Sequence, residues 1–367
     1  MRKIYSCGLT SSYQSGHSHD DGNFHLVKVI QDHDAVRKIS CGRSHTIFET
    51  MDGQIFAFGR NDYFQCAVGQ DGDIQIPKPC LFKPNNIQVY QPYMFSTGWF
   101  HSAFISSDQK NVYFAGYCSH ISISKSYIKV FHNISSLITQ LGPTQKFTHV
   151  GSGDHVFMVV VDNNHLYSIS STISHVDILK TTGQALKEVR MEKGGVAFCT
   201  TSGALYVREY SGNSSSTFVR DHSVLNLNSS SVGVLSFKSE NLRQTIIDNT
   251  RYPFEYDVYP SFCSHFAYNP QTRTLTATGS NNDRQLGVYG NGSAKDEPVT
   301  SINKLLKENP SWKLLILAPG CDFTMIMLGQ DWEQTKEVLR FKACLFKQLS
   351  DHWERLSDVQ FQCRQNF

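Results

Sequence analysis

A short frame that recurs along the chain limits its fold more than any other sequence feature. Residues 8–16, 59–67 and 279–287 each begin with a glycine and place a glutamine six residues later. Each glycine ends a segment in which apolar and polar residues alternate, the pattern of a β-strand. The positions of the frame are Gly8, Gln14 and Gly16, then Gly59, Asn61 and Gln65, and then Gly279, Asn281, Gln285 and Gly287. Such self-similarity predicts a fold built from repeated structural units.

A second landmark precedes the frame within a unit. A glycine stands three residues before a histidine, and two strands joined by a polar turn then lead to the glycine that ends the unit. The last hairpin has a phenylalanine in the place of the histidine. The landmark positions, some in weaker copies, are Cys41, Gly42, His45, Gly98, His101, Gly116, His155, His265 and Gly320.

The spacing of these landmarks predicts the architecture. We count seven units, one of them a degenerate copy over residues 232–247. The chain begins with a strand that ends a unit, residues 4–8, whereas its last hairpin, residues 314–328, lacks such a strand. Pairing the two ends completes a sheet and leaves the ring without an open edge. The prediction is an all-β fold, a seven-bladed β-propeller over residues 1–329 closed by N- and C-terminal strands.

Composition excludes several classes of protein. The chain has 367 residues, a formal net charge of +2 and 40% hydrophobic residues, which is typical of a folded chain with a core. Because 34 basic residues are nearly balanced by 32 acidic ones, direct nucleic-acid binding is disfavoured. The apolar runs are far shorter than the roughly 20 residues of a membrane helix, so we expect no membrane association. Ten cysteines without a CxxC pair indicate reduced thiols and a cytoplasmic location, with the nucleus as the alternative.

The repeated residues are interpreted as structural positions. The glycines mark strand ends where a side chain would clash or φ is positive. Histidines that recur once per unit lie on a ring and do not converge on one site, so we expect each to bond the backbone of the neighbouring blade. The glutamines are expected to satisfy backbone groups of the following turn. Signatures of phosphate loops, zinc proteases and serine hydrolases are absent from the sequence, which predicts a protein that is not an enzyme and has no catalytic, cofactor-binding or metal residues.

One segment near the N-terminus leaves an alternative open. Imidazole and carboxylate side chains occur there at the short spacing that transition metals use. Their place in a variable loop between units favours solvated polar residues, and a metal site is the alternative. The residues are His17, His19, Asp20, Asp21, His25 and His33.

The landmarks together resemble the repeat of the regulator of chromosome condensation family, or RCC-type repeat. The shared pattern is Cys-Gly-x-x-His, then Asp-Gly before a strand, then Gly-x-Asn-x-x-x-Gln. The resemblance covers roughly residues 1–329 and is strongest over 41–69 and 279–290. It implies a seven-bladed propeller.

Residues 330–367 follow a different pattern. Apolar residues recur there every three or four positions, which predicts one or two amphipathic helices. The segment Leu-Ser-Asp-Val-x-Phe that follows, residues 356–361, resembles the opening of a BTB/POZ domain, so we expect a helical linker and the truncated beginning of such a domain. The alternative is a terminal helix that docks on the propeller rim.

Two hypotheses of function remain at this stage. In the first, the protein is a non-catalytic scaffold whose propeller loops bind a protein partner, and a BTB-like C-terminus adds dimerisation or recruitment of a cullin-type ubiquitin ligase. Homo-oligomers are expected only with a full BTB domain. In the second, which the family resemblance implies, the protein is a guanine-nucleotide exchange factor for a Ran-type small GTPase. The near-zero net charge and the absence of a basic N-terminal tail favour the scaffold.

Overall fold

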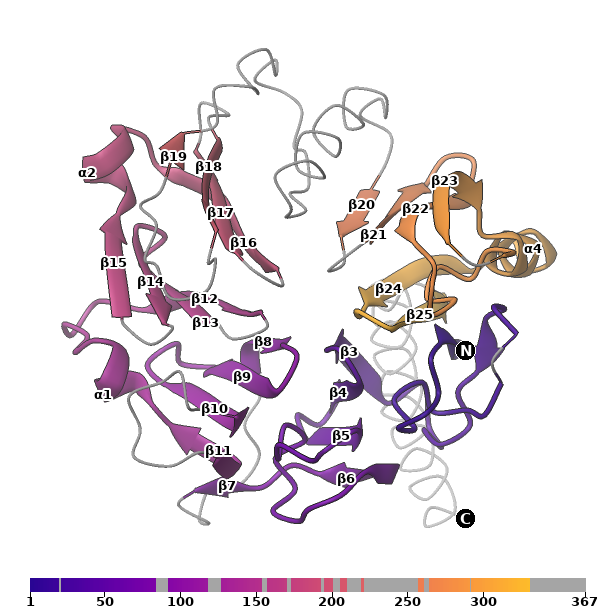
Figure 1. Ribbon diagram of the computed structural model, residues 1–367, viewed down its shortest axis with the longest axis horizontal. Helices are drawn as coiled ribbons and strands as arrows, with labels where there is room; N and C mark the ends of the chain where they lie inside the picture. Colours follow the sequence, from indigo (N-terminus) through magenta and orange to yellow (C-terminus); the bar gives the residue numbers. More distant parts are fainter. Residues whose placement is uncertain are drawn as a thin grey trace, which may run out of the picture.

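The computed structural model shows β-sheets arranged around a common centre (Figure 1). It describes residues 1–19, 21–83, 92–117, 127–153, 157–169, 173–192, 195–200, 205–209, 219–220, 257–260, 264–290 and 292–330. The sheets follow one another around the ring in chain order, and the strands within each are almost all antiparallel. The fold is a β-propeller.

The first three sheets contain the first strand of the chain, the last described hairpin and the repeat around Cys41 to Gly69. The closing sheet has the order β2-β1-β25-β24, with β1 (Arg2–Gly8), β2 (His25–Leu26), β24 (Lys313–Pro319) and β25 (Phe323–Gly329). The next contains β3 (Val36–Cys41), β4 (His45–Thr50), β5 (Ile55–Gly59) and β6 (Ile74–Pro79). A five-stranded sheet follows, in which β7 (Phe82–Lys83) lies parallel to β11 (Tyr127–Asn133), beside β10 (Val112–Tyr117), β9 (His101–Ser106) and β8 (Pro92–Thr97).

The other three sheets are four-stranded. The first contains β12 (Phe147–Ser152), β13 (Phe157–Val161), β14 (His165–Ile169) and β15 (Ile173–Asp177). The second contains β16 (Leu186–Glu192), β17 (Gly195–Thr200), β18 (Leu205–Glu209) and β19 (Val219–Arg220). The third contains β20 (Asp257–Pro260), β21 (Ser264–Asn269), β22 (Thr274–Ser280) and β23 (Ser293–Pro298). The described helices are α1 (Ser135–Ile138), α2 (Ile178–Thr182) and α4 (Thr300–Glu308).

The prediction of seven blades is wrong. The described residues form six sheets, five with four strands and one with five. Spacing alone miscounts because a blade exists only where strands pair, and pairing is not visible in the distance between glycines. The degenerate unit over residues 232–247, the predicted C-terminal helices and the BTB-like segment all lie outside the described residues.

The two ends of the described ring pair as the sequence indicates. Strand β1 lies antiparallel to β25 along its whole length, from Arg2 opposite Gly329 to Gly8 opposite Phe323. Strand β1 therefore belongs to the same sheet as the last described hairpin. This pairing joins the beginning of the chain to residues more than three hundred positions away and protects the edges of both strands.

The core lies between neighbouring sheets. Phe58 of β5, Phe104 of β9 and Phe323 of β25 are fully buried and belong to one apolar cluster, although they come from three different sheets. In a second cluster the rings of Phe114 of β10 and Phe157 of β13 meet edge to face between the five-stranded sheet and the next one, with centroids 5.5 Å apart. Burial of such rings is the main term that holds adjacent blades together.

Helix α4 shows how a connection between blades is secured. Ile302 and Leu306 are four positions apart, share one face of the helix and are buried in the core. The guanidinium of Arg273 donates from Nη2 to the carbonyl oxygens of Leu306, Asn309 and Trp312 at 2.5 to 2.9 Å. These bonds satisfy carbonyls that the helix end leaves open. No helix among the described residues has the length and apolar character needed to cross a membrane.

Candidate partner-binding face

One face of the propeller is formed by the loops that join β3 to β4, β5 to β6, β8 to β9 and β24 to β25, together with the paired end of β10 and start of β11; we call it the loop face. Its inner part is a chain of backbone hydrogen bonds between neighbouring blades. Cys321 N donates to Gly42 O at 3.2 Å, Arg43 N to Gly98 O at 3.1 Å, and Trp99 N to Gly153 O at 3.0 Å. The repeated glycines thus let successive loops approach each other closely.

Each of these loops also closes on itself in the same way. The amide of the glycine donates to the carbonyl three residues later, from Gly42 to His45, from Gly98 to His101 and from Gly320 to Phe323, at 2.8 to 2.9 Å. The phenylalanine therefore occupies the same loop position as the histidines. The shared geometry depends on the glycine, since the third residue can change.

The structure corrects the expected partner of His45. Its Nε2 lies 2.8 Å from the Ser102 hydroxyl of the neighbouring sheet, where a backbone partner was predicted. Because that hydroxyl donates to Gln65 O at 2.8 Å, Nε2 of His45 carries the proton and donates to Ser102. Complete burial lowers the pKa of His45 to about 3, so the ring is neutral at physiological pH.

The other repeated histidines that the structure describes, His101 and His265, are not bonded to His45. His101 is buried and stacks on Phe114, with ring centroids 5.1 Å apart. His265 lies in β21, opposite Thr278, and His155 is outside the described residues. Cys41, next to the first landmark glycine, is a free, buried thiol whose pKa burial raises to about 12, so it stays protonated.

The glutamines and asparagines of the frame shape the turn that follows each third strand. Gln14, Gln65 and Gln285 accept a hydrogen bond from the amide two residues earlier, at 2.8 to 3.0 Å. Asn61 accepts from Cys66 N at 3.0 Å and donates to Gln70 O at 2.7 Å, and Asn281 is bonded in the same way.

The residue before each glutamine adopts a left-handed conformation that sequence reasoning missed. Tyr13, Phe64 and Arg284 have φ of 64°, 61° and 57°. Such values are uncommon for residues other than glycine. The buried amide contacts on either side hold the turn in this form.

Aromatic side chains gather where two neighbouring blades meet on the loop face. The ring of Tyr63, from the β5–β6 loop, lies 4.6 Å from Phe100 and 5.8 Å from Tyr117. Trp99 extends the group at 6.0 Å from Phe100, and Tyr127 at 5.8 Å from Tyr117. We call these five residues the aromatic cluster. Tyr127 is 39% exposed and the other four are half-buried, so the cluster offers its edges to solvent.

Two arginines border the aromatic cluster. The guanidinium of Arg43 lies over the Trp99 ring at 4.2 Å, and its Nε is 3.4 Å from the Asp322 carboxylate. Arg60 lies 6.0 Å from the Tyr63 ring and pairs with Asp62 at 2.6 Å. Tryptophan, tyrosine and arginine are the residues enriched where proteins bind other proteins. The only sign of the aromatic cluster in the sequence is the pair Trp99-Phe100 directly after a landmark glycine. The other rings of the cluster are distant in the sequence, so the pair alone did not reveal it.

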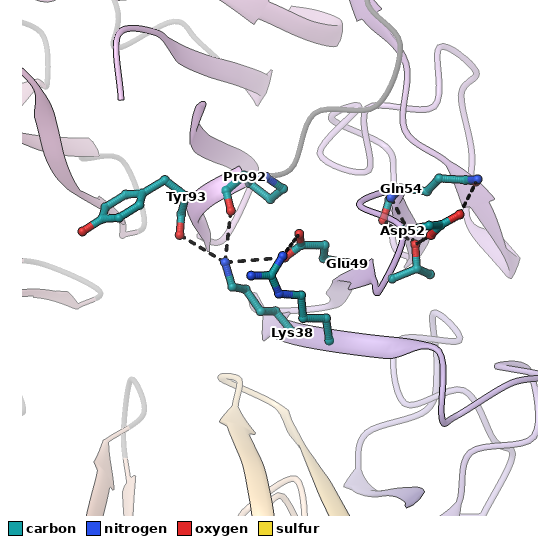
Figure 2. Close-up of polar contacts among 8 residues, drawn as sticks. Lys38, Glu49, Asp52, Gln54, Pro92 and Tyr93 are labelled. Atoms are coloured by element: carbon teal, nitrogen blue, oxygen red, sulfur yellow. Dashed lines mark hydrogen bonds and ion pairs between the residues drawn. The ribbon is translucent and has the colours of Figure 1, made fainter. Parts of the chain in front are cut away.

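The opposite face carries a polar link between two sheets (Figure 2). The Glu49 side chain is fully buried at the end of β4, 3.3 Å from Arg37 Nη1 and 3.5 Å from Lys38 Nζ. Lys38 also donates to the carbonyl oxygens of Pro92 and Tyr93, at the start of β8, at 3.0 and 3.1 Å. Burial raises the pKa of Glu49, although the two cations lower it. The arrangement joins neighbouring blades.

The described residues of the N-terminal histidine segment bond to the backbone and to one another and form no group of metal ligands. The rings of His17, His19 and His25 lie 4.1 to 5.8 Å apart. However, His17 binds Ser6 O through Nε2 and accepts from the His19 amide through Nδ1, and His25 Nε2 pairs with Asp21 at 2.7 Å.

The fourth histidine of that segment is held in the same manner. Both ring nitrogens of His33 bond to the backbone, at Ile4 and Val27. Asp20 lies outside the described residues. Over the part of the chain that the structure describes, no group of three or more His, Cys, Asp and Glu side chains is arranged to hold a metal ion.

Comparison with known proteins agrees with the repeat and the fold. Residues 36–65 and 52–105 match models of the regulator of chromosome condensation (RCC1) repeat. An X-linked retinitis pigmentosa GTPase regulator homolog of Caenorhabditis elegans is 36% identical over 66 residues, which cover 18% of this chain and 5% of the relative. Protein RCC2 of Mus musculus is 34% identical over 85 residues, which cover 23% and 16%. The matches thus span less than a fifth of these relatives.

A solved structure extends the likeness to almost the whole ring. Yeast RCC1 (Prp20), in a crystal structure with Kap60, superposes with a TM-score of 0.64. The superposition covers 93% of this chain and 92% of that one, at 11% sequence identity. At such low identity the likeness shows the fold alone. The chain is a β-propeller in which residues 36–105 match the RCC1 repeat.

Proposed function

We propose that this RCC1-type propeller is a non-catalytic interaction scaffold that binds a protein partner with its loop face. The observation that carries the proposal is the aromatic cluster with Arg43 and Arg60 at its border. Large aromatic rings and arginines supply most of the binding energy in protein interfaces.

The packing of the cluster supports the same proposal. Its rings are already held by one another, so little side-chain entropy is lost when a partner covers them. The backbone bonds from Arg43 and Trp99 to the next loops hold three successive blades in one arrangement. A preorganised surface of this kind suits a partner with a flat or slightly projecting apolar patch and acceptor groups for the arginines.

The experiment compares two faces of the full chain in cells. Trp99→Ala combined with Tyr127→Ala removes rings from the cluster, and Tyr93→Ala, a 49% exposed tyrosine beside the opposite-face link, is the matched control. Proximity labelling identifies partners, and each is then purified and titrated. We expect the double variant to weaken a direct partner by about 30-fold, the value of a 2 kcal/mol hot spot, and Tyr93→Ala to leave it unchanged. If wild type, the double variant and Tyr93→Ala bind the partner equally, the proposal is contradicted.

A second candidate function is guanine-nucleotide exchange on a Ran-type small GTPase. It is favoured by the match to a protein named as a GTPase regulator homolog and by the likeness to yeast RCC1. The test is to load Ran and related GTPases with a fluorescent nucleotide and add the protein. Faster release that the Trp99→Ala, Tyr127→Ala variant abolishes supports exchange at the loop face, whereas an unchanged release rate contradicts it.

The proposal rests on the propeller alone. Nothing in the fold or in the matches supports the BTB/POZ-like segment, dimerisation through it or cullin recruitment, and residues 331–367 lie outside the described part.

A further inference from the structure

Two histidines face each other on the outer strands of the sheet β12–β15, at the end remote from the loop face. His165 begins β14 and lies opposite Asp177 of β15, while Tyr167 lies opposite His175. Residues two positions apart in a strand point to the same side of the sheet. These four side chains therefore share one surface, and the described structure brings Nδ1 of His165 within 3.2 Å of Nε2 of His175.

This nitrogen–nitrogen distance is that of two ligands on one metal ion. Zinc binds imidazole nitrogen at about 2.0 to 2.1 Å, and two ligands of a tetrahedral ion are then about 3.3 Å apart. Without an ion, one nitrogen donates its proton to the other. When an ion binds, the ring that donated takes its other neutral tautomer, with the proton on its other ring nitrogen, and both facing nitrogens then offer a lone pair to the ion.

The surroundings hold both rings in place. Tyr167 stacks on His175 with centroids 4.7 Å apart. The Asp177 carboxylate lies 3.9 Å from His165 Nδ1 through Oδ2, while its Oδ1 accepts from Asn164 Nδ2 and Lys180 N at 3.1 and 3.0 Å. At this distance the carboxylate balances the charge of an ion without being a ligand, and its own bonds fix its position.

We propose that His165 and His175 bind one divalent transition-metal ion such as Zn²⁺ or Ni²⁺. Water completes its coordination, since the His165 and Asp177 side chains are 28% and 31% exposed and solvent reaches the pair. The ion links β14 to β15 and so stabilises the outer edge of the sheet. The N-terminal histidines differ, because their bonded ring nitrogens face backbone groups or the Asp21 carboxylate, whereas the two nitrogens that meet here face each other.

The test titrates Zn²⁺, and separately Ni²⁺, into the metal-stripped full chain by calorimetry. We expect one high-affinity ion per chain. His165→Gln and His175→Gln each abolish it, and Asp177→Asn, which keeps a side-chain oxygen for the Lys180 amide, weakens it by about tenfold. His19→Gln, in the N-terminal histidine segment, is the control and leaves the affinity unchanged.

Two results overturn the site: unchanged binding in His165→Gln and His175→Gln, or loss of binding in His19→Gln alone. If the glutamine variants do not fold, imidazole ¹⁵N NMR of the unsubstituted chain decides. Zn²⁺ must shift the Nδ1 signal of one ring and the Nε2 signal of the other at the same stoichiometry, and signals that do not move reject the proposal.

Discussion

Glycine residues of the repeat serve two physically different purposes. Gly8, Gly59, Gly116 and Gly279 have φ between 103° and 115°, a conformation that other residues rarely adopt. Gly42 and Gly98 lie outside the positive-φ region but stand against the carbonyl oxygen of the next loop, which leaves no room for a Cβ atom. The first set shapes a strand end, whereas the second allows neighbouring blades to touch.

Replacement of Gly42 tests the contact between blades. In Gly42→Ala the new methyl group collides with Gly98 O and must lengthen the Arg43–Gly98 hydrogen bond, so we expect a loss of about 2 to 3 kcal/mol in the free energy of unfolding. Gly142→Ala is the control, because its nearest neighbour atom lies at 3.4 Å and its φ is not positive. Urea denaturation measures both, and equal stability of the two variants contradicts the argument.

The buried neutral His45 predicts a pH dependence. Its pKa is about 3 in the folded chain and about 6.5 when unfolded, so the folded state binds this proton less readily. The stability that His45 contributes above pH 6.5 is therefore lost as the pH falls from 6.5 toward 3, by up to about 1.4 kcal/mol per pH unit. His45→Gln is expected to be about 1 to 2 kcal/mol less stable at pH 7.5, but less sensitive to acid. Urea denaturation of both proteins from pH 7.5 to 4.5 tests this prediction. If the free energies of unfolding of wild type and His45→Gln change in parallel with pH, the prediction is contradicted.

At the scale of elements, strand β3 is joined to β8 by the Lys38 side chain at one end and by the Ser40–Thr97 hydroxyl contact, at 2.7 Å, toward the other. Lys38 donates to two carbonyls of β8 and pairs with the buried Glu49 (Figure 2). The pKa of Glu49 is raised above 4.5, which means that burial outweighs the attraction of the two cations for the charged form. The lysine therefore contributes more to the link than the carboxylate does.

This imbalance predicts unequal effects of substitution. Lys38→Met leaves the Glu49 charge buried with Arg37 alone, and we expect a loss of about 2 kcal/mol, reduced by the partial exposure of Lys38. Glu49→Gln is expected to change stability by less than about 1 kcal/mol. Because the folded chain takes up this proton more readily, wild type should gain stability relative to Glu49→Gln as the pH falls toward 4.5. Thermal denaturation of both variants and wild type at pH 7.5 and 5 measures these changes in stability. A larger loss of stability in Glu49→Gln than in Lys38→Met contradicts the argument.

For the whole molecule, the pairing of β1 with β25 makes the first residues part of the last described sheet. Ile4 is fully buried within β1 and belongs to the cluster that also contains Phe58 and Phe104. Damage at this position should therefore reach sheets that are far away in the sequence.

We predict that Ile4→Asp lowers the free energy of unfolding by at least about 3 kcal/mol, since it buries a charge and opens the ring. Hydrogen exchange should accelerate in β25 and also in β4 and β5. Met1→Asp, at a residue 70% exposed, is the control and should have no effect. Fast exchange confined to β1 and β25 would show that the ring does not depend on its closure.

The sequence by itself determined the all-β repeat, the glycines at or next to the strand ends, Gly8, Gly59 and Gly279, and the pairing of the first strand with the last described hairpin. These follow from local conformation and apolar alternation. Only the tertiary structure decided the number of sheets, the Ser102 partner of His45 and the aromatic cluster. These features depend on contacts between repeats. Tyr63 meets Phe100 because the loops of two neighbouring blades lie side by side, and the spacing of residues within a single repeat does not predict such a contact.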